Sequence, residues 1–384
     1  MIKLINATEN VYQSIDNKHH TLGVFIDFSK AFDTVNHSIL LKKLELYGIR
    51  GNMLKLLTSY LSDRKQYVNY GNIDSTLLDI ACEVPQGSVL GPLLFIIFVN
   101  DIINLSNLGK FILFADDLNL FLSNKDRSLL YRNANSILHS IYEYCVANKL
   151  VINFDKCCFI EFSMKGEKFP CKALGILNYQ FKQVTGCKFL GVHINNRLNW
   201  NDHINHVISQ VSKSCGAMYS VSKLVPQKIL RKIYMALIQP YIMYCNPLWG
   251  ALKNSQKMTK LFILQKKCIR IISNNTIRIN KMLPHTKPMF TRLKILNVFN
   301  IHTYLTACES MKVIQNKIPR LICNMFAISN RNERLIMPLI SSSRIKNNSF
   351  VVNSVKIINY LLYHDISYCK LSLETFKTRL KSIF

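Results

Sequence analysis

The sequence predicts an α+β fold, with strands and helices in the first half and helices alone in the second. Short apolar runs of β-type composition alternate with amphipathic helical patterns up to about residue 165. After Trp200 only helical periodicity remains, interrupted at Pro226 and Pro240. We expect a mixed domain over residues 1–165, a β-ribbon over 166–198, a helical region over 199–275, and a basic helical region over 276–384.

The composition is globular and strongly basic. Hydrophobic residues make up 49% of the 384 residues, enough for two or three domains with cores of their own. The chain has 49 Lys and Arg against 22 Asp and Glu, a formal charge of +27. Solubility rarely needs so much charge of one sign, and no basic amphipathic helix indicates a membrane surface. A polyanionic partner is therefore favoured.

Targeting signals are not evident in the sequence. No run approaches the ~20 apolar residues of a membrane span, and Met1–Asn6 lacks the apolar core of a signal peptide. The 12 cysteines include no C-x-x-C pair, so we expect reduced, mostly buried thiols rather than a zinc site. We expect an intracellular protein of the nucleus or cytoplasm, neither secreted nor membrane-bound.

The first strand ends in a carboxylate. After a mixed helical end at Asn6–Asn17, Leu22–Ile26 has the composition of a buried strand and is followed by Asp27. Such a position often carries chemistry in open sheets, although Asp27 or Ser29 could equally cap a turn. Asp33 is typical of a turn or cap.

Helices and exposed strands follow. His37–Tyr47, closed by Gly48, and Asn52–Leu61 have helical patterns. Arg64–Tyr70 and Ser75–Val84 are predicted strands.

A turn and a strongly apolar helix come next. Pro85–Gly87 is a turn signal, and Gly91-Pro92 opens the helix. Gln86 and Gly87 are either plain loop residues or, because glycine allows close approach, contacts to a ligand. Asn100-Asp101 ends the helix as a cap or as functional residues.

Two adjacent carboxylates then separate two apolar runs. Phe111–Ala115 and Leu118–Leu122 flank Asp116 and Asp117, which predicts a β-hairpin. A surface turn would explain the pair by itself. A divalent-metal site is the sharper interpretation, because neighbouring carboxylates repel unless a cation lies between them.

The remaining segments are predicted more simply. A helix over Arg127–Ala147 leads to a strand over Cys157–Phe162, and Asn178–Val184 with Cys187–Ile194 predicts a ribbon. Helices follow at His203–Val221, Gln227–Ile238 and Gln256–Ile272. His203 and His206 are expected on an exposed helix face; a metal role is disfavoured because Asp202, the nearby acid, suits an N-cap.

Asp27, Asp116 and Asp117 all stand at ends of apolar β-segments, and these ends can lie side by side. That arrangement suits catalysis by two divalent ions ~4 Å apart, each bridging carboxylate and phosphate oxygens. Mg²⁺ prefers such ligands, and the basic surface would hold nucleic acid.

With these residues in place, the chain resembles the reverse transcriptases of non-LTR, LINE-type retrotransposons, especially the jockey-like group. Five segments carry the resemblance in order: Phe25–Val35, Pro85–Phe95, Phe114–Asp117, Asn148–Leu150 with Asn153 and Lys156, and Phe189–Val192. Three later segments resemble the thumb region: Leu198–Trp200, Arg231–Tyr234 and Tyr241–Gly250.

The resemblance implies a polymerase palm with truncated fingers, followed by a helical thumb and a helical C-terminal region. It implies an RNA template, a DNA primer, deoxynucleoside triphosphates and Mg²⁺ or Mn²⁺, and it leaves the oligomeric state open. Asp27, Asp116 and Asp117 would bind metal and catalyse. The implied nucleotide-binding residues are Phe28, Phe32, Gln86, Gly87 and Lys156, and the implied primer grip is Phe189, Leu190 and Gly191.

Within these roles, Phe32 would block a ribose 2′-hydroxyl, and Lys156 would neutralise the pyrophosphate leaving group. Core packing for Phe32 and a solvated turn for Lys156 are the simpler alternatives.

The sequence departs from the family's pattern before Asp27, where 26 residues leave no room for the family's finger motifs. Neither an endonuclease domain nor a C-terminal Cys/His knuckle is recognisable. We therefore expect either an RNA-directed DNA polymerase or a truncated, inactive remnant that only binds nucleic acid. An RNA-templated RNA polymerase is a third possibility, against which Phe32 argues.

Overall fold

The fold is described from a computed structural model of the chain. It covers all residues except 81, 86, 164–172, 253–254, 275–283, 316, 318–322, 324, 329–335, 339–348, 364–371 and 384. These residues form two compact units: residues 17–185, and residues 1–16 together with 186–384.

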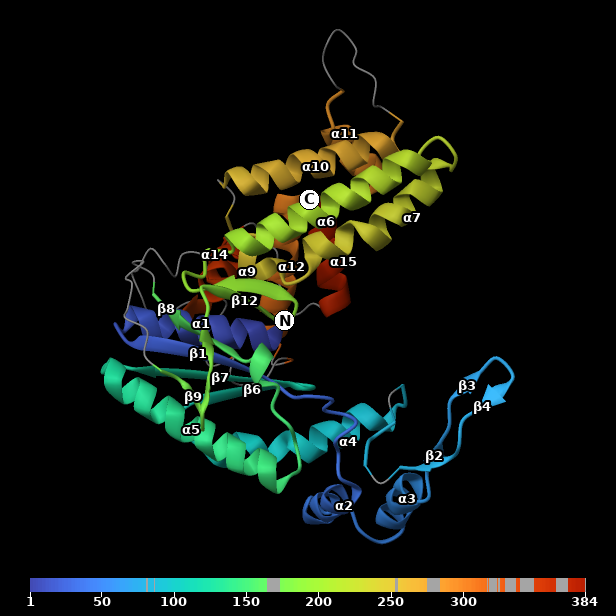
Figure 1. The fold of residues 1–384 in the computed structure, drawn as a ribbon. Helices are drawn as coiled ribbons and strands as arrows, with labels where there is room; N and C mark the ends of the chain where they lie inside the picture. The colour runs from blue at the N-terminus through green and yellow to red at the C-terminus, as the bar shows by residue number, and fades with distance from the viewer. Residues whose placement is uncertain are drawn as a thin grey trace. The chain divides into compact units, whose positions relative to one another are not determined.

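A five-stranded sheet with the order β11-β8-β1-β7-β6 is the centre of the first unit (Figure 1). Its strands are β1 (His20–Asp27), β6 (Lys110–Phe114), β7 (Asp117–Asn124), β8 (Cys158–Phe162) and β11 (Lys182–Gln183). The central strand β1 runs antiparallel to β7 and β8, and β11 is parallel to β8. Residues 21–26 of β1 are buried, as their apolar run predicts.

Helices cover the sheet and continue its core. The long helix α5 (Arg127–Ala147) packs on β7 and β1 through an apolar stripe that includes Leu130, Ile137 and Ile141. The other helical elements of the unit are α2 (His37–Leu46), α3 (Gly51–Leu61), α4 (Leu90–Val99), and the 3₁₀ turns η1 (Asn100–Leu105) and η2 (Phe154–Lys156). Their buried side chains join those of the sheet in one core.

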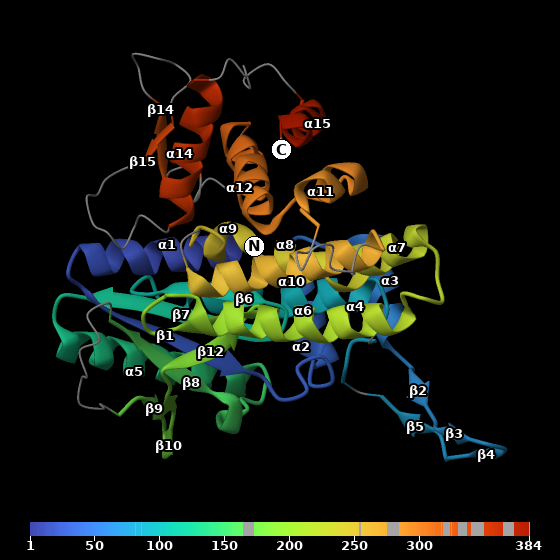
Figure 2. The same ribbon diagram turned by 90° about the horizontal axis from the view of Figure 1, so that it is seen from above.

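A narrow ladder of short strands extends away from this sheet, as Figures 1 and 2 both show. It pairs β2 (Lys65–Gln66) with β5 (Leu78–Asp79), and β3 (Asn69–Tyr70) with β4 (Ile73–Asp74). The predictions of one continuous strand over Arg64–Tyr70 and another over Ser75–Val84 are therefore wrong. The ladder strands are exposed on both faces. Without a buried apolar face to stabilise them, their pairing stays short.

The ribbon predicted over residues 178–194 is divided. Its second part is correct, because β12 (Gly186–Phe189) pairs with β13 (Val192–Asn195). Its first part pairs elsewhere: β10 (Tyr179–Gln180) with β9 (Gly175–Ile176), and β11 with β8 of the main sheet. The free edge of β8 offers hydrogen-bonding groups to β11, and the composition of a strand does not show which edge it will pair with.

The second unit is mainly helical. Helices α6 (Asn201–Val221) and α10 (Gln256–Ile272) lie side by side in both views. The further helices are α7 (Gln227–Leu237), α8 (Gln239–Met243), α9 (Asn246–Trp249), α11 (Lys287–Leu293), α12 (Val298–Ile314), α14 (Phe350–Tyr363) and α15 (Leu373–Ile383). Helices α12, α14 and α15 enclose a small apolar core.

Two features of this unit correct the sequence analysis. The chain forms a further hairpin, β14 (Phe326–Ile328) with β15 (Ile336–Pro338), so this half is not purely helical. His203 is only 3% exposed, because α6 turns it toward Trp249, and the exposed face expected for it is wrong.

The N-terminal helix α1 (Ile2–Asp16) belongs to the second unit. The Tyr12 hydroxyl donates to the Leu198 carbonyl at 3.3 Å, and the Val351 amide donates to the Glu9 carboxylate at 3.4 Å. In the part of the chain that the structure describes, no helix has both the length and the apolar character that a membrane crossing requires.

Candidate active site

Strand register brings the predicted carboxylates together at one end of the sheet. Asp27 is the last residue of β1 and lies directly opposite Asp117, the first residue of β7. Phe114 pairs with the same Asp117, so Ala115 and Asp116 form the tight turn between β6 and β7. Ala115 adopts a left-handed φ of 51° there. Opposed residues in antiparallel strands have Cα atoms about 4.5–5.5 Å apart, so the three carboxylates are neighbours.

This crowding affects the ionisation of Asp117. Partial burial, and then the negative charges of Asp116 and Asp27, raise the pKa of the Asp117 carboxyl above its ordinary value. Each cause disfavours the ionised form. A bound cation would reverse the electrostatic part of this effect.

The Asp27 carboxylate is held from a distant segment of the chain. Asn153 Nδ2 donates to Asp27 Oδ2 at 3.2 Å, and Lys156 Nζ lies 3.3 Å from the same oxygen. The backbone reinforces the contact, because the Asn153 amide donates to the Asp27 carbonyl at 2.8 Å. Lys156, which is 69% exposed, is therefore brought next to Asp27, as its predicted role requires.

The donor set suits a hard divalent cation. Three carboxylates supply the oxygen ligands that Mg²⁺ prefers, and burial, followed by the charges of Asp116 and Asp27, raises the pKa of the Asp117 carboxyl. As the side chains stand, however, no three His, Cys, Asp or Glu among the described residues are grouped to hold a metal ion. Lys156 and Asn153 both contact Asp27 Oδ2, so a metal ion bound through that oxygen would compete with them.

Phe32 lies beside the turn that precedes α4. The Val84 amide donates to the Phe32 carbonyl at 3.0 Å, which fixes the start of the Pro85–Gly87 turn against it. The Phe32 ring packs on Phe95 of α4, with ring centroids 4.7 Å apart. Gly87 has a φ of 84°, a conformation that disfavours other residues. Gln86 lies outside the described residues.

The same turn is closed by residues that the sequence analysis did not single out. Ser88 Oγ donates to the Pro85 carbonyl and accepts from the Gly91 amide, both at 2.8 Å. A Cβ at Gly91 would collide with the Pro85 carbonyl, so glycine is required there for the turn to close on the helix. Gly91 had been noted only as part of the signal that opens the helix.

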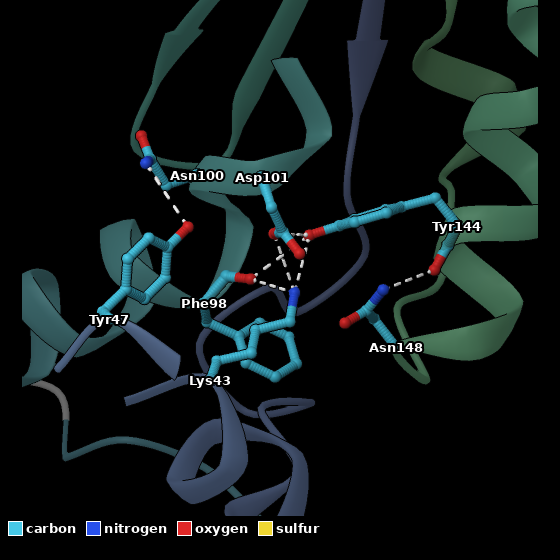
Figure 3. Close-up of polar contacts among 7 residues, drawn as sticks. All are labelled: Lys43, Tyr47, Phe98, Asn100, Asp101, Tyr144 and Asn148. Atoms are coloured by element: carbon cyan, nitrogen blue, oxygen red, sulfur yellow. Dashed lines mark hydrogen bonds and ion pairs between the residues drawn. The ribbon is translucent and has the colours of Figure 1, made fainter. Parts of the chain in front are cut away.

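A buried lysine fixes the other end of α4, as Figure 3 shows. Lys43 Nζ on α2 donates to the Asp101 carboxylate at 2.8 Å, to the Phe98 carbonyl at 2.7 Å, and to the Tyr144 hydroxyl at 2.9 Å. The Tyr144 hydroxyl on α5 also donates to Asp101, at 2.6 Å. Asp101 therefore joins three helical elements, as expected of a residue that supports the end of α4.

Phe28 and the three predicted primer-grip residues are the remaining residues that the resemblance implies. The Phe28 side chain is 3% exposed and belongs to the core, so its ring is not open to a nucleotide. Phe189, Leu190 and Gly191 form the end of β12 and the turn to β13, in the second unit.

Comparison with protein families places the chain in a family. Residues 2–194 match the family model described as reverse transcriptase (RNA-dependent DNA polymerase). The chain belongs to the reverse transcriptase family. The mixed sheet-and-helix unit is thus a reverse transcriptase palm, and the resemblance seen in the sequence is confirmed.

Relatives of this reverse transcriptase chain come from mobile elements of Drosophila melanogaster. It is 26% identical over 286 residues to the "Probable RNA-directed DNA polymerase from transposon BS", covering 70% of this chain and 30% of that protein. It is 24% identical over 273 residues to the "RNA-directed DNA polymerase from mobile element jockey", covering 68% of this chain and 29% of that protein. The chain therefore matches less than a third of the length of these relatives.

Among solved structures, the apo telomerase from Candida tropicalis is similar at 12% identity and a TM-score of 0.42, over 82% of this chain and 54% of that one.

Proposed function

We propose that this chain is the polymerase part of an RNA-directed DNA polymerase of a non-LTR retrotransposon. It would add deoxynucleotides to a DNA primer on an RNA template. The observation that carries the proposal is the pairing of Asp27 with Asp117 beside Asp116, in a chain of the reverse transcriptase family.

Asp27, Asp116 and Asp117 are the residues that would hold Mg²⁺ or Mn²⁺. When bound, such ions lower the pKa of an attacking hydroxyl and stabilise the charge of an in-line phosphoryl displacement. Asp117 would favour cation binding because a cation offsets the repulsion between its carboxylate and those of Asp116 and Asp27. An ion held by Asp27 Oδ2 would replace the Lys156 ammonium at that oxygen and leave the ammonium available to another anion.

Lys156 then has a position suited to the leaving group. Its side chain is 69% exposed, and its ammonium lies 3.3 Å from a metal-binding carboxylate. An ammonium at such a place stabilises the charge that develops on pyrophosphate.

Phe32 and the Pro85–Gly87 turn would shape the nucleotide site. The Phe32 ring is backed by Phe95, which is fully buried, so it cannot retreat easily from a bulky sugar. The left-handed Gly87 leaves backbone open to close approach, because a Cβ there would meet nothing within 4 Å. Gln86 is proposed as a nucleotide contact on the resemblance alone.

Nucleic acid would be held largely by charge. The chain carries +27, and neutralising phosphates with Lys and Arg releases counterions and makes binding salt-dependent. The template, the primer and the nucleoside triphosphates are proposed as partners on this basis.

Primer extension on an RNA template with Mg²⁺ tests the proposal. Wild-type chain should extend the primer, and Asp116→Ala should not; extension that survives this change would sink the assignment. Salt-sensitive binding without extension by wild-type chain would instead support an inactive remnant. Preferential incorporation of ribonucleotides would support an RNA polymerase.

A further inference from the structure

The turn between β12 and β13 has a conformation that its sequence does not favour. Phe189 and Val192 form the last pair of the ribbon, so Leu190 and Gly191 make a two-residue turn. Their φ values are 45° and 80°. A turn with both residues left-handed normally carries Asn or Asp before Gly. Leucine is costly there, because its Cβ approaches the following carbonyl, so other contacts must maintain the turn.

Tyr244 supplies those contacts. Its hydroxyl donates to the Leu190 carbonyl at 2.7 Å. Its ring lies so close to Gly191 that a Cβ there would be 3.2 Å from both Cε1 and Oη. The hydroxyl therefore fixes one turn residue and the ring covers the other.

Tyr244 is itself fixed in place. It ends α8, where its amide donates to the Pro240 carbonyl at 2.9 Å. Its carbonyl accepts from Nε1 of Trp249, a fully buried side chain, at 2.9 Å. Yet Tyr244 is 48% exposed. A half-exposed tyrosine held this firmly contributes more to the turn than to the core.

We infer that Tyr244 is a positioning residue for the primer strand, which acts by holding the Leu190–Gly191 turn in shape. The inference rests on the proposed function, because the resemblance assigns Phe189–Gly191 to the primer grip. Gly191 is exposed, and the exposed Lys188 lies in the adjoining ribbon pair, opposite His193. A rigid turn with a cation beside it suits a phosphodiester backbone.

Tyr244→Phe tests the inference, because it removes the hydroxyl and keeps the ring. We expect the primer–template dissociation rate to rise about fivefold, the effect of one neutral hydrogen bond, while the KM for nucleotide stays unchanged and the melting temperature falls by at most a few degrees. Tyr241→Phe is the matched control: it makes the same change at a 40% exposed tyrosine of the same helix. It should leave the dissociation rate unchanged.

Gly191→Ala provides a second test from the other side of the contact. The new methyl group would strain a left-handed φ and press on the Tyr244 ring, so primer binding should weaken more than in Tyr244→Phe. Because both changes act on one contact, the loss of primer binding in the double variant, measured from wild type, should be smaller than the sum of the two single losses.

Two results would overturn the inference, and they are distinguishable from failure of the proposed function. One is an active Tyr244→Phe chain with wild-type primer dissociation. The other is a chain whose melting temperature and nucleotide KM change while primer dissociation does not, as a purely structural role predicts. A wild-type chain that neither binds nor extends a primer–template contradicts the proposed function, and the inference falls with it.

Discussion

At the scale of single residues, the sequence predicts the reactive groups better than their partners. Asp116 and Asp117 stand out because two carboxylates interrupt an apolar pattern, and the predicted hairpin around them is confirmed. Asn153 and Lys156 reach Asp27 across more than 120 positions of sequence, and a contact of that kind has no local signal. Phe28 lies one position from a carboxylate yet is buried, because its ring packs into the core of the first unit.

The raised pKa of Asp117 makes a prediction about stability. The folded chain holds this proton more tightly than the unfolded chain, so stability falls as pH rises through the window between the ordinary value of 3.8 and the raised value. Above that window the ionised carboxylate is a net destabilising group. Asp117→Asn should therefore raise the melting temperature at pH 7 in metal-free buffer, and thermal scans should show the gain disappear below about pH 3.8. A lower melting temperature at pH 7 would contradict this electrostatic account.

Phe32 makes a prediction about sugar selection. Phe32→Val shortens a ring that Phe95 supports from behind, and so opens room for a 2′-hydroxyl. Ribonucleotide incorporation relative to deoxynucleotide should rise, by up to about 10²-fold, the scale on which a pocket rejects one extra hydroxyl. The ratio of the two kcat/KM values measures it, and deoxynucleotide incorporation is the internal control. An unchanged ratio would assign Phe32 to the core.

At the scale of elements, helices with strong periodicity are predicted well and short strands are not. The bounds of α5 and α10 agree with the sequence prediction at both ends, because a buried stripe and an N-cap at Asp126 or Ser255 define them. The ladder strands β2 to β5 are two residues long and lack a buried face. Pairing of β11 with β8 depends on a free sheet edge that no local pattern reveals.

The contacts of Lys43 with the end of α4 lead to a prediction about stability. Lys43→Met leaves the Asp101 carboxylate and the Phe98 carbonyl without their ammonium donor, in a site where the lysine side chain is 12% exposed. Asp101 is 38% exposed, and both acceptors still contact the Tyr144 hydroxyl, so the loss should be about 1 kcal/mol. Chemical unfolding should show that loss, whereas Lys42→Met, at the exposed neighbouring lysine, should change stability by less than about 0.5 kcal/mol. Equal effects of the two changes would show that the Lys43 contacts are weak.

At the scale of the whole molecule, the sequence predicts the net charge and the family, but it does not predict which segments form each compact unit. The family expectation is confirmed by the match over residues 2–194. The division into domains at residues 165, 198 and 275 stays a prediction, and the two compact units are bounded differently. Helix α1 joins the later half through Tyr12 and Leu198, 186 residues apart, and such a contact exists only in the folded chain.

The central claim is that Asp117, with its two neighbours, performs metal-dependent polymerisation. Single-nucleotide incorporation on an RNA template with Mg²⁺, compared between Asp117→Asn and Asp126→Asn, tests it most directly. Both changes remove one carboxylate charge, but Asp126 is an exposed helix cap whose role asparagine preserves. The account predicts a loss of at least about 10²–10³-fold for Asp117→Asn and a rate within about twofold of wild type for Asp126→Asn. Equal rates for the two variants would contradict it.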